Sequence, residues 1–170
     1  MLTQRIPTRR RLLAALAATC LASVGPAALA AAAAKGEVVD LPALQLIDGK
    51  RLADWKGQPA VIVFWSTDCA FCKRHNARLD KLYRELQARG SKLRIVGIAT
   101  DRDPQAVRRH VAEHDLRFPV ALDGAALRAR LTERAVVPMT VLIDGSGRLL
   151  LAIPGEMTED DIAAIGAQLG

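Results

Sequence analysis

Two cysteines, Cys69 and Cys72, lie shortly after the continuous apolar run AVIVFW at residues 60–65. A short apolar run of this kind, preceded by Gly57 and Pro59, predicts a strand buried at the centre of a sheet. After the second cysteine the apolar residues change to helical spacing, with charged residues between them. The cysteine pair is therefore expected where a buried strand meets the N-terminus of a helix, and this restricts the chain to an α/β fold.

Further strands and helices alternate along the rest of the chain. The expected elements are short strands on both sides of the Asp48–Gly49 turn, a strand in KLRIVGIAT, a helix over 104–115 begun by Pro104, an extended segment in FPVALD, a helix over 125–131, a hairpin around DGSG at 144–147, and a last helix capped by Thr158. This order predicts a mixed central sheet with helices on both faces and a short N-terminal β extension. We expect one domain over residues 41–170.

The first thirty residues have the composition of an export signal. Arg5 and Arg9 to Arg11 precede an apolar stretch without acidic residues, which ends in Ala28-Leu29-Ala30. This layout predicts a signal peptide cleaved after Ala30 and a periplasmic protein, and TRRRLL resembles the twin-arginine export motif. An uncleaved leader that anchors the chain is less favoured, because Pro26 would interrupt a spanning helix. The alanine-rich residues 31–40 are expected to be a flexible lead-in.

The charge of the chain argues against a nucleic-acid partner. The full chain carries a net charge of +6, but the leader holds four arginines and no acid, so 20 basic residues then face 18 acidic ones. A surface that follows phosphates needs clustered Lys and Arg, and usually aromatic residues, which make up only 4% of this sequence.

The spacing of the two cysteines allows three interpretations. A structural disulfide is disfavoured, because closing so small a loop stabilises a fold little. A zinc site with His110 and His114 is disfavoured by the long interval between the cysteines and the histidines, which we expect on the solvated face of their helix. Redox exchange fits best, since the N-terminus of a helix stabilises a thiolate on Cys69, and Cys72 lies one turn further to resolve a mixed disulfide.

Three motifs in order resemble the TlpA-like (ResA-like) exported thioredoxins: the lead-in DGKRLADWKGQPAVIVFW, the segment FWSTDCAFC, and VVPMTVLIDGSGRLL. The resemblance implies a thioredoxin fold and a thiol-disulfide oxidoreductase that needs neither a cofactor nor a metal. It also implies that Pro138 is a cis-proline beside the disulfide and that Val137 presents its backbone to a substrate strand. Trp65 and Phe71 are further candidate substrate contacts, although Trp65 fits the core as well.

Several positions depart from the family pattern. Val63 stands where many relatives have a buried Asp or Asn, Asp68 could oppose thiolate formation, and Ala70-Phe71 replaces the usual x-Pro between the cysteines. His75 stands where many TlpA-like members have glutamate. We hypothesise that His75 is a nearby base or a cation that stabilises the thiolate, and the alternative is that it caps a pocket or faces solvent.

The resemblance suggests partners as well as chemistry. It implies disulfide-bearing exported proteins as substrates and a membrane electron donor of the DsbD or CcdA type, and we expect a monomer. A disulfide-introducing oxidase or isomerase remains an alternative, as does a non-enzymatic module that holds a soft metal between the cysteines. A peroxiredoxin is disfavoured, because Val63 occupies the position that its Pro-x-x-x-Thr-x-x-Cys motif gives to proline.

Overall fold

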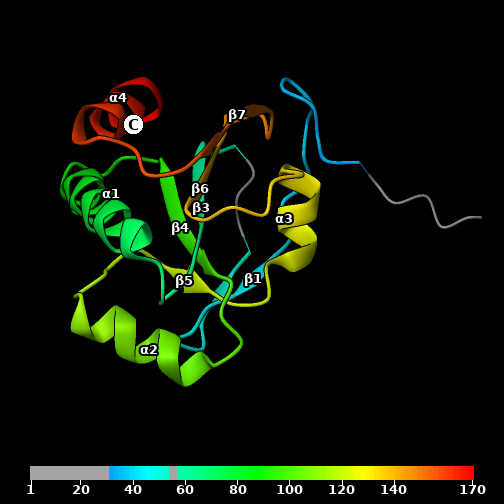
Figure 1. The fold of residues 1–170 in the computed structure, drawn as a ribbon. Coiled ribbons are helices and arrows are strands. Elements are labelled where there is room, and N and C mark those ends of the chain that lie inside the picture. Colours follow the sequence, from blue (N-terminus) through cyan, green and yellow to red (C-terminus); the bar gives the residue numbers. More distant parts are fainter. Residues whose placement is uncertain (1–30, 54–56) are drawn as a thin grey trace, which may run out of the picture.

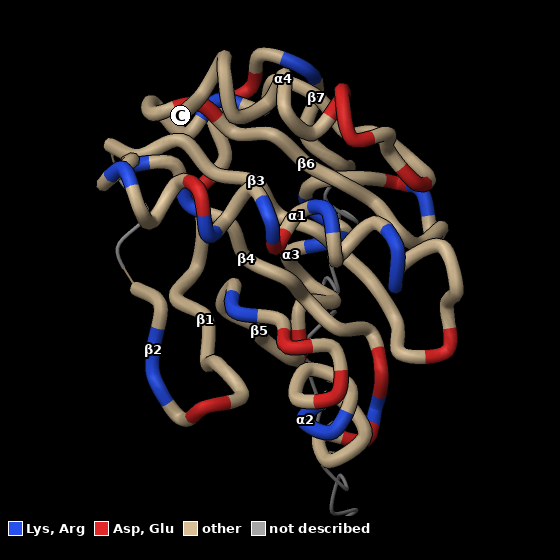
Figure 2. Tube along the Cα trace, turned by 90° about the vertical axis from the view of Figure 1, so that its left-hand side faces the viewer, with Lys and Arg blue, Asp and Glu red and all other residues tan. Residues whose placement is uncertain are grey.

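The computed structural model describes residues 31–53 and 57–170 (Figure 1). The predicted signal peptide and its cleavage point lie outside the described residues. In the part that is described, no helix is long and apolar enough to cross a bilayer. Basic and acidic residues are interspersed along the chain and do not gather on one element (Figure 2).

The predicted mixed sheet is confirmed. Its five strands run in the order β5-β4-β3-β6-β7, and their bounds are β3 Ala60–Trp65, β4 Arg94–Ala99, β5 Val120–Ala121, β6 Met139–Ile143 and β7 Leu149–Pro154. The run that leads to the cysteines is the central strand, parallel to β4 and antiparallel to β6. All six of its residues are buried. Because both faces of β3 are covered, its sequence shows no alternation of polar and apolar residues.

Helices cover both faces of the sheet (Figure 1). They are α1 Ala70–Ala88, α2 Pro104–Glu113, α3 Ala125–Leu131 and α4 Glu159–Leu169. Alternate residues of β3 enter two separate cores. Val61, Val63 and Trp65 pack with residues of α1, α2 and α4. The other residues of the strand pack with α3 and the N-terminal segment.

The helix ends follow the sequence signals. Asp103 caps α2 directly before Pro104, and Thr158 forms a capping box with Asp161 at the start of α4. After α1 ends, Gly90 adopts a φ of +65°, in the left-handed region that glycine reaches without strain. These local signals therefore placed the helix starts correctly, whereas α2 ends at Glu113, two residues before the predicted end.

The N-terminal β extension is a two-stranded antiparallel ribbon, β1 Leu44–Gln45 with β2 Arg51–Leu52. Leu46 continues it through a bridge to Ala121 in β5. The ribbon thus covers one edge of the main sheet, which would otherwise expose unpaired backbone groups.

Residues 31–40 differ from the expected flexible lead-in, because they pack along the start of β7. The backbone N–H of Val39 donates to the carbonyl of Gly147 at 2.8 Å, and that of Leu149 donates to Glu37 at 2.9 Å. Val39 is buried. The physical reason is that β7 is an edge strand, and its free backbone groups bind a neighbouring extended segment.

A glycine in β4 keeps space for two aromatic rings beneath the cysteine pair. A Cβ at Gly97 would lie 2.6 Å from a ring carbon of Phe118 and 2.8 Å from Nε1 of Trp65. We expect Gly97→Ala to lower the free energy of unfolding by about 1–3 kcal/mol, measured by urea denaturation. Gly145→Ala is the control, since its nearest neighbour would be 3.7 Å away. Equal stability of Gly97→Ala and the wild type would contradict this packing.

Candidate active site

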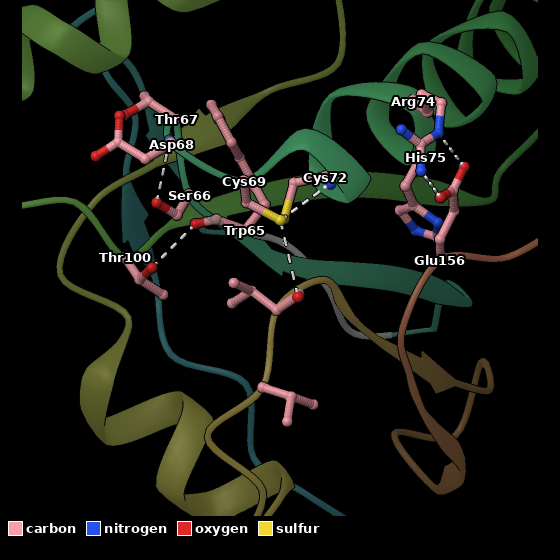
Figure 3. Close-up of a disulfide and its surroundings, with 12 residues drawn as sticks. Trp65, Ser66, Thr67, Asp68, Cys69, Cys72, Arg74, His75, Thr100 and Glu156 are labelled. Atoms are coloured by element: carbon pink, nitrogen blue, oxygen red, sulfur yellow. Dashed lines mark hydrogen bonds and ion pairs between the residues drawn. A yellow bond between two sulfur atoms is a disulfide. The ribbon is translucent and has the colours of Figure 1, made fainter.

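Cys69 is the N-cap of α1, at the junction that the sequence predicted. Its backbone is extended, with a φ of −101° and a ψ of 106°, and its sulfur accepts a hydrogen bond from the N–H of Cys72 at 3.1 Å (Figure 3). The sulfur therefore faces the unpaired N–H groups of the first turn and the positive end of the helix dipole. Both favour negative charge on that sulfur, so reduction of the pair would leave a nucleophilic thiolate on Cys69.

Cys69 and Cys72 form a disulfide with a Cα–Cα distance of 5.1 Å. The two sulfurs differ in access, because Cys72 is fully buried whereas Cys69 is partly exposed. The carbonyl oxygen of Val137 lies 3.8 Å from the Cys69 sulfur. In the disulfide form this approach is a van der Waals contact and not a hydrogen bond, since the sulfur carries no hydrogen to donate. A partner molecule can thus reach Cys69 but not Cys72.

The segment opposite the disulfide comes from the start of β6. The peptide bond between Val137 and Pro138 is cis. Pro138 is buried, whereas Val136, directly before Val137, is 48% exposed. The structure thus places the Val137 carbonyl against the Cys69 sulfur, with Pro138 directly after it in the chain.

The turn between β3 and α1 is held by Asp101, a residue that the sequence analysis did not identify. Its carboxylate accepts hydrogen bonds from the backbone N–H of Thr67 at 3.2 Å and from the Thr67 hydroxyl at 2.5 Å. The preceding residue, Thr100, donates its N–H to the carbonyl of Trp65 at 2.8 Å. The place of Asp101 in the sequence could have indicated this role. Asp101 follows a strand parallel to β3, and the carboxyl ends of parallel strands meet at one sheet edge.

His75 has a different environment from the one hypothesised. It is fully buried, its Nδ1 accepts from the N–H of Met157 at 3.1 Å, and its Nε2 lies 2.9 Å from the Thr140 hydroxyl. Because Nδ1 accepts, the ring hydrogen is on Nε2 and is donated to Thr140. Burial is the main cause that lowers the pKa of His75 to about 4. The ring is therefore neutral near pH 7 with both nitrogens occupied, which supports neither a base nor a cation beside the thiolate, nor a side chain facing solvent.

Glu156 forms an ion-pair cluster on the outside of α1, also missed by the sequence analysis (Figure 3). Arg74 binds its carboxylate through two nitrogens, at 3.0 and 2.6 Å, and Arg78 through one at 2.5 Å. These hydrogen bonds lower the pKa of Glu156 to about 2. Arg74 also lies over the ring of Phe71, 5.0 Å from its centroid. The cluster joins the first turns of α1 to the segment before α4.

A groove of about 550 Å³ runs beside the disulfide. Phe71, Val137, Pro138 and Met157 give it apolar walls, and the remaining lining residues are Arg78, Gly155, Glu156, Thr158 and Glu159. Phe71 is 59% exposed although it is a large apolar side chain. The candidate substrate contacts Phe71 and Val137 therefore share one surface.

Trp65 does not belong to that surface. It is fully buried, so of the two alternatives for this residue the core position is correct. The ring of His110 lies 5.2 Å from the Trp65 ring, centroid to centroid. The expectation that His110 lies on a solvated face holds only in part, because the residue is half-buried and its Nε2 is shielded from solvent. In the part of the chain that is described, no group of three or more His, Cys, Asp or Glu side chains is arranged to hold a metal.

Comparison with known proteins decides the family. The sequence pattern of the AhpC/TSA family matches residues 37–151, more than half of the chain. The chain belongs to the AhpC/TSA family. It is also similar to the thiol-disulfide oxidoreductase ResA of Bacillus thuringiensis subsp. konkukian, with 30% identity over 118 residues, which cover 68% of this chain and 67% of ResA. The resemblance to ResA-like proteins is confirmed.

Solved structures confirm the thioredoxin fold of this AhpC/TSA family member. A thiol:disulfide interchange protein of the thioredoxin family from Chlorobium tepidum matches with a TM-score of 0.68 and 22% identity, over 81% of this chain and 99% of that chain. A secreted Mycobacterium tuberculosis disulfide oxidoreductase homologous to E. coli DsbE matches with a TM-score of 0.63 and 22% identity, over 75% and 95%.

Proposed function

We propose that this protein is an exported thiol-disulfide oxidoreductase that reduces disulfides of partner proteins. The observation that carries the proposal is the Cys69–Cys72 disulfide at the N-terminus of α1, with Cys69 accessible and Cys72 buried. The similarity to a ResA oxidoreductase supports the same activity. The positions of the two sulfurs support Cys69 as the nucleophile and Cys72 as the resolving thiol.

The reaction has two steps. The thiolate of Cys69 attacks one sulfur of the partner's disulfide, so a mixed disulfide forms and the partner's second sulfur leaves as a thiolate. Cys72 then loses its proton and attacks the Cys69 sulfur, which releases the partner's first sulfur as a thiolate. The protein ends as the Cys69–Cys72 disulfide, and the partner has gained the two electrons.

The groove beside the disulfide is suited to an extended polypeptide. The carbonyl of Val137 lies next to the Cys69 sulfur and offers a backbone hydrogen-bond acceptor to a substrate strand. Phe71 and Pro138 provide apolar contact for the side chains of that strand. We assign substrate contacts to Val137, Pro138 and Phe71, and give Trp65 a place in the core.

The leader supports a location for the protein, and the redox reaction indicates what kind of electron donor it needs. An apolar leader preceded by arginines supports export, and the periplasm is the compartment we propose. An oxidising compartment does not reduce the Cys69–Cys72 disulfide back to a dithiol, so a reductase there needs electrons from a membrane donor, for which we propose the DsbD or CcdA type. We propose that the protein acts as a monomer.

The direction of electron flow is tested by the reduction potential of the pair. The protein is equilibrated with glutathione or dithiothreitol redox buffers and the fraction of disulfide is measured by thiol alkylation and mass spectrometry. We expect a value near the reducing end of the thioredoxin-like range, about −270 mV, whereas a value near about −120 mV would make the protein a disulfide donor. Cys20→Ser is the parent for this experiment, since it removes the third thiol of the chain.

A further inference from the structure

The second step of the proposed reaction requires a base, because the resolving thiol is buried. Cys72 is fully buried in an apolar core that includes Val63. A thiol in apolar surroundings ionises reluctantly, and the thiolate is the form that attacks a disulfide. Some group must therefore accept the proton of Cys72 as it attacks Cys69.

Three titratable groups near the pair are unsuited to this task. Both ring nitrogens of His75 are occupied by Thr140 and Met157. The carboxylate of Asp101 accepts hydrogen bonds from the turn before Cys69. Asp68 is exposed on that turn, on the solvent side of the disulfide, whereas Cys72 is buried beneath it.

His110 remains, and its ring contact places it beside the strand that leads to the active-site turn. Its ring packs against Trp65, the last residue of the strand that leads to the cysteines. Its Nε2 is buried and has no hydrogen-bond partner among the described residues. A neutral imidazole offers one nitrogen as an acceptor, so Nε2 is a buried base that the fold does not use structurally when the ring hydrogen is on Nδ1.

Other buried polar atoms also lack protein partners within the described part of the chain. They are Nε1 of Trp65 and both amide atoms of Asn76, which is fully buried. Asn76 lies one helical turn after Cys72 on α1 and therefore on the same side of the helix. A polar site with several such groups is suited to an internal water, which needs two to four hydrogen-bond partners.

We infer that His110 accepts the proton of Cys72 in the resolving step, through an internal water bound by the polar groups of Trp65 and Asn76. This inference rests on the proposed function. The proton passes from the Cys72 sulfur to Nε2, the Cys69–Cys72 bond forms, and the bond between Cys69 and the partner breaks. The partner's sulfur leaves as a thiolate, and the imidazolium returns its proton to solvent.

The charges around His110 favour its neutral, accepting form. Burial lowers the pKa of His110 most, and the adjacent His114 lowers it further. Asp101 before α2 and Glu113 on α2 raise the pKa, while Lys73 on α1 lowers it. The net shift is downward, so the ring is mostly unprotonated at neutral pH and can take up a proton.

Stopped-flow reaction with 5,5′-dithiobis(2-nitrobenzoate) tests the inference in the reduced Cys20→Ser protein. Attack by Cys69 releases the first coloured thiolate, and attack by Cys72 on the mixed disulfide releases the second. We expect His110→Gln to slow the second release about 10- to 100-fold at pH 7, as loss of a general base does, and to leave the first unchanged. The second release should also shift to higher pH, because the thiol must then ionise without the imidazole.

His114→Gln is the matched control, since it changes the neighbouring ring on the same helix and keeps His110. It should leave the first release unchanged and affect the second far less than His110→Gln does. His110→Phe is a second variant that keeps a ring against Trp65 and should slow the second release as His110→Gln does. A second release within twofold of the parent in both His110 variants, with an unchanged pH profile, would overturn the inference. If the parent gave no first release, Cys69 would not be a nucleophile. That result would contradict the proposed function, and the inference would fail with it.

Discussion

Replacement of Cys69 by serine is expected to lower the rate of disulfide reduction by at least about 1,000-fold, the scale of effect seen when a nucleophile is removed. The reason is that the sulfur at the N-terminus of α1 is the accessible one, and a serine hydroxyl does not ionise near neutral pH. The measurement is the rate at which the reduced protein cleaves the disulfides of a model protein such as insulin, followed by precipitation of the separated chains.

Cys72→Ser is the matched variant, because it removes the buried sulfur and keeps the nucleophile. We expect it to attack once and then to stop as a stable mixed disulfide, visible by mass spectrometry as a covalent adduct through Cys69. Cys69→Ser should form no such adduct. If Cys72→Ser stayed unmodified and Cys69→Ser formed the adduct, the roles of the two cysteines would be reversed.

The stability of the folded protein is expected to fall by about 3 kcal/mol as the pH is lowered from 7.5 to 4, because of His75. The pKa of its buried ring is about 4 in the folded protein, against an ordinary value of 6.5. Between these values the unfolded chain binds the proton and the folded protein does not. The stabilisation is therefore complete above pH 6.5 and is lost as the pH falls towards 4. Urea denaturation at several pH values measures it.

His75→Gln is the test variant, since an amide can keep a hydrogen bond to Thr140 or Met157 without titrating. Its stability should depend much less on pH between 6.5 and 4.5 than that of the wild type. Glu156 does not interfere in this window, because its pKa is shifted from 4.5 down to about 2. His114→Gln should follow the wild-type curve. Equal slopes for the wild type and His75→Gln would show that burial of His75 does not govern the acid response.

Local sequence signals were sufficient for most elements of the fold. The apolar run at residues 60–65 predicted the central strand because both of its faces are buried, and Pro104 and Thr158 marked helix starts through caps formed within a few residues. The N-terminal segment was not predictable in this way. Its alanine-rich sequence has no strand signal of its own, and its order comes from the edge of β7, which is distant in sequence.

The sequence by itself determined the chemistry of the site. Two cysteines one helical turn apart, at the change from a buried strand to a helix, specify a thiolate at a helix N-terminus, because only short-range geometry is involved. Only the tertiary structure decided the surroundings. Burial neutralised His75, packing turned His110 towards Trp65, and Asp101 and Glu156 were brought from other loops. Burial, hydrogen bonding and ion pairing depend on contacts between residues far apart in the chain. The spacing of residues within one segment cannot predict these contacts.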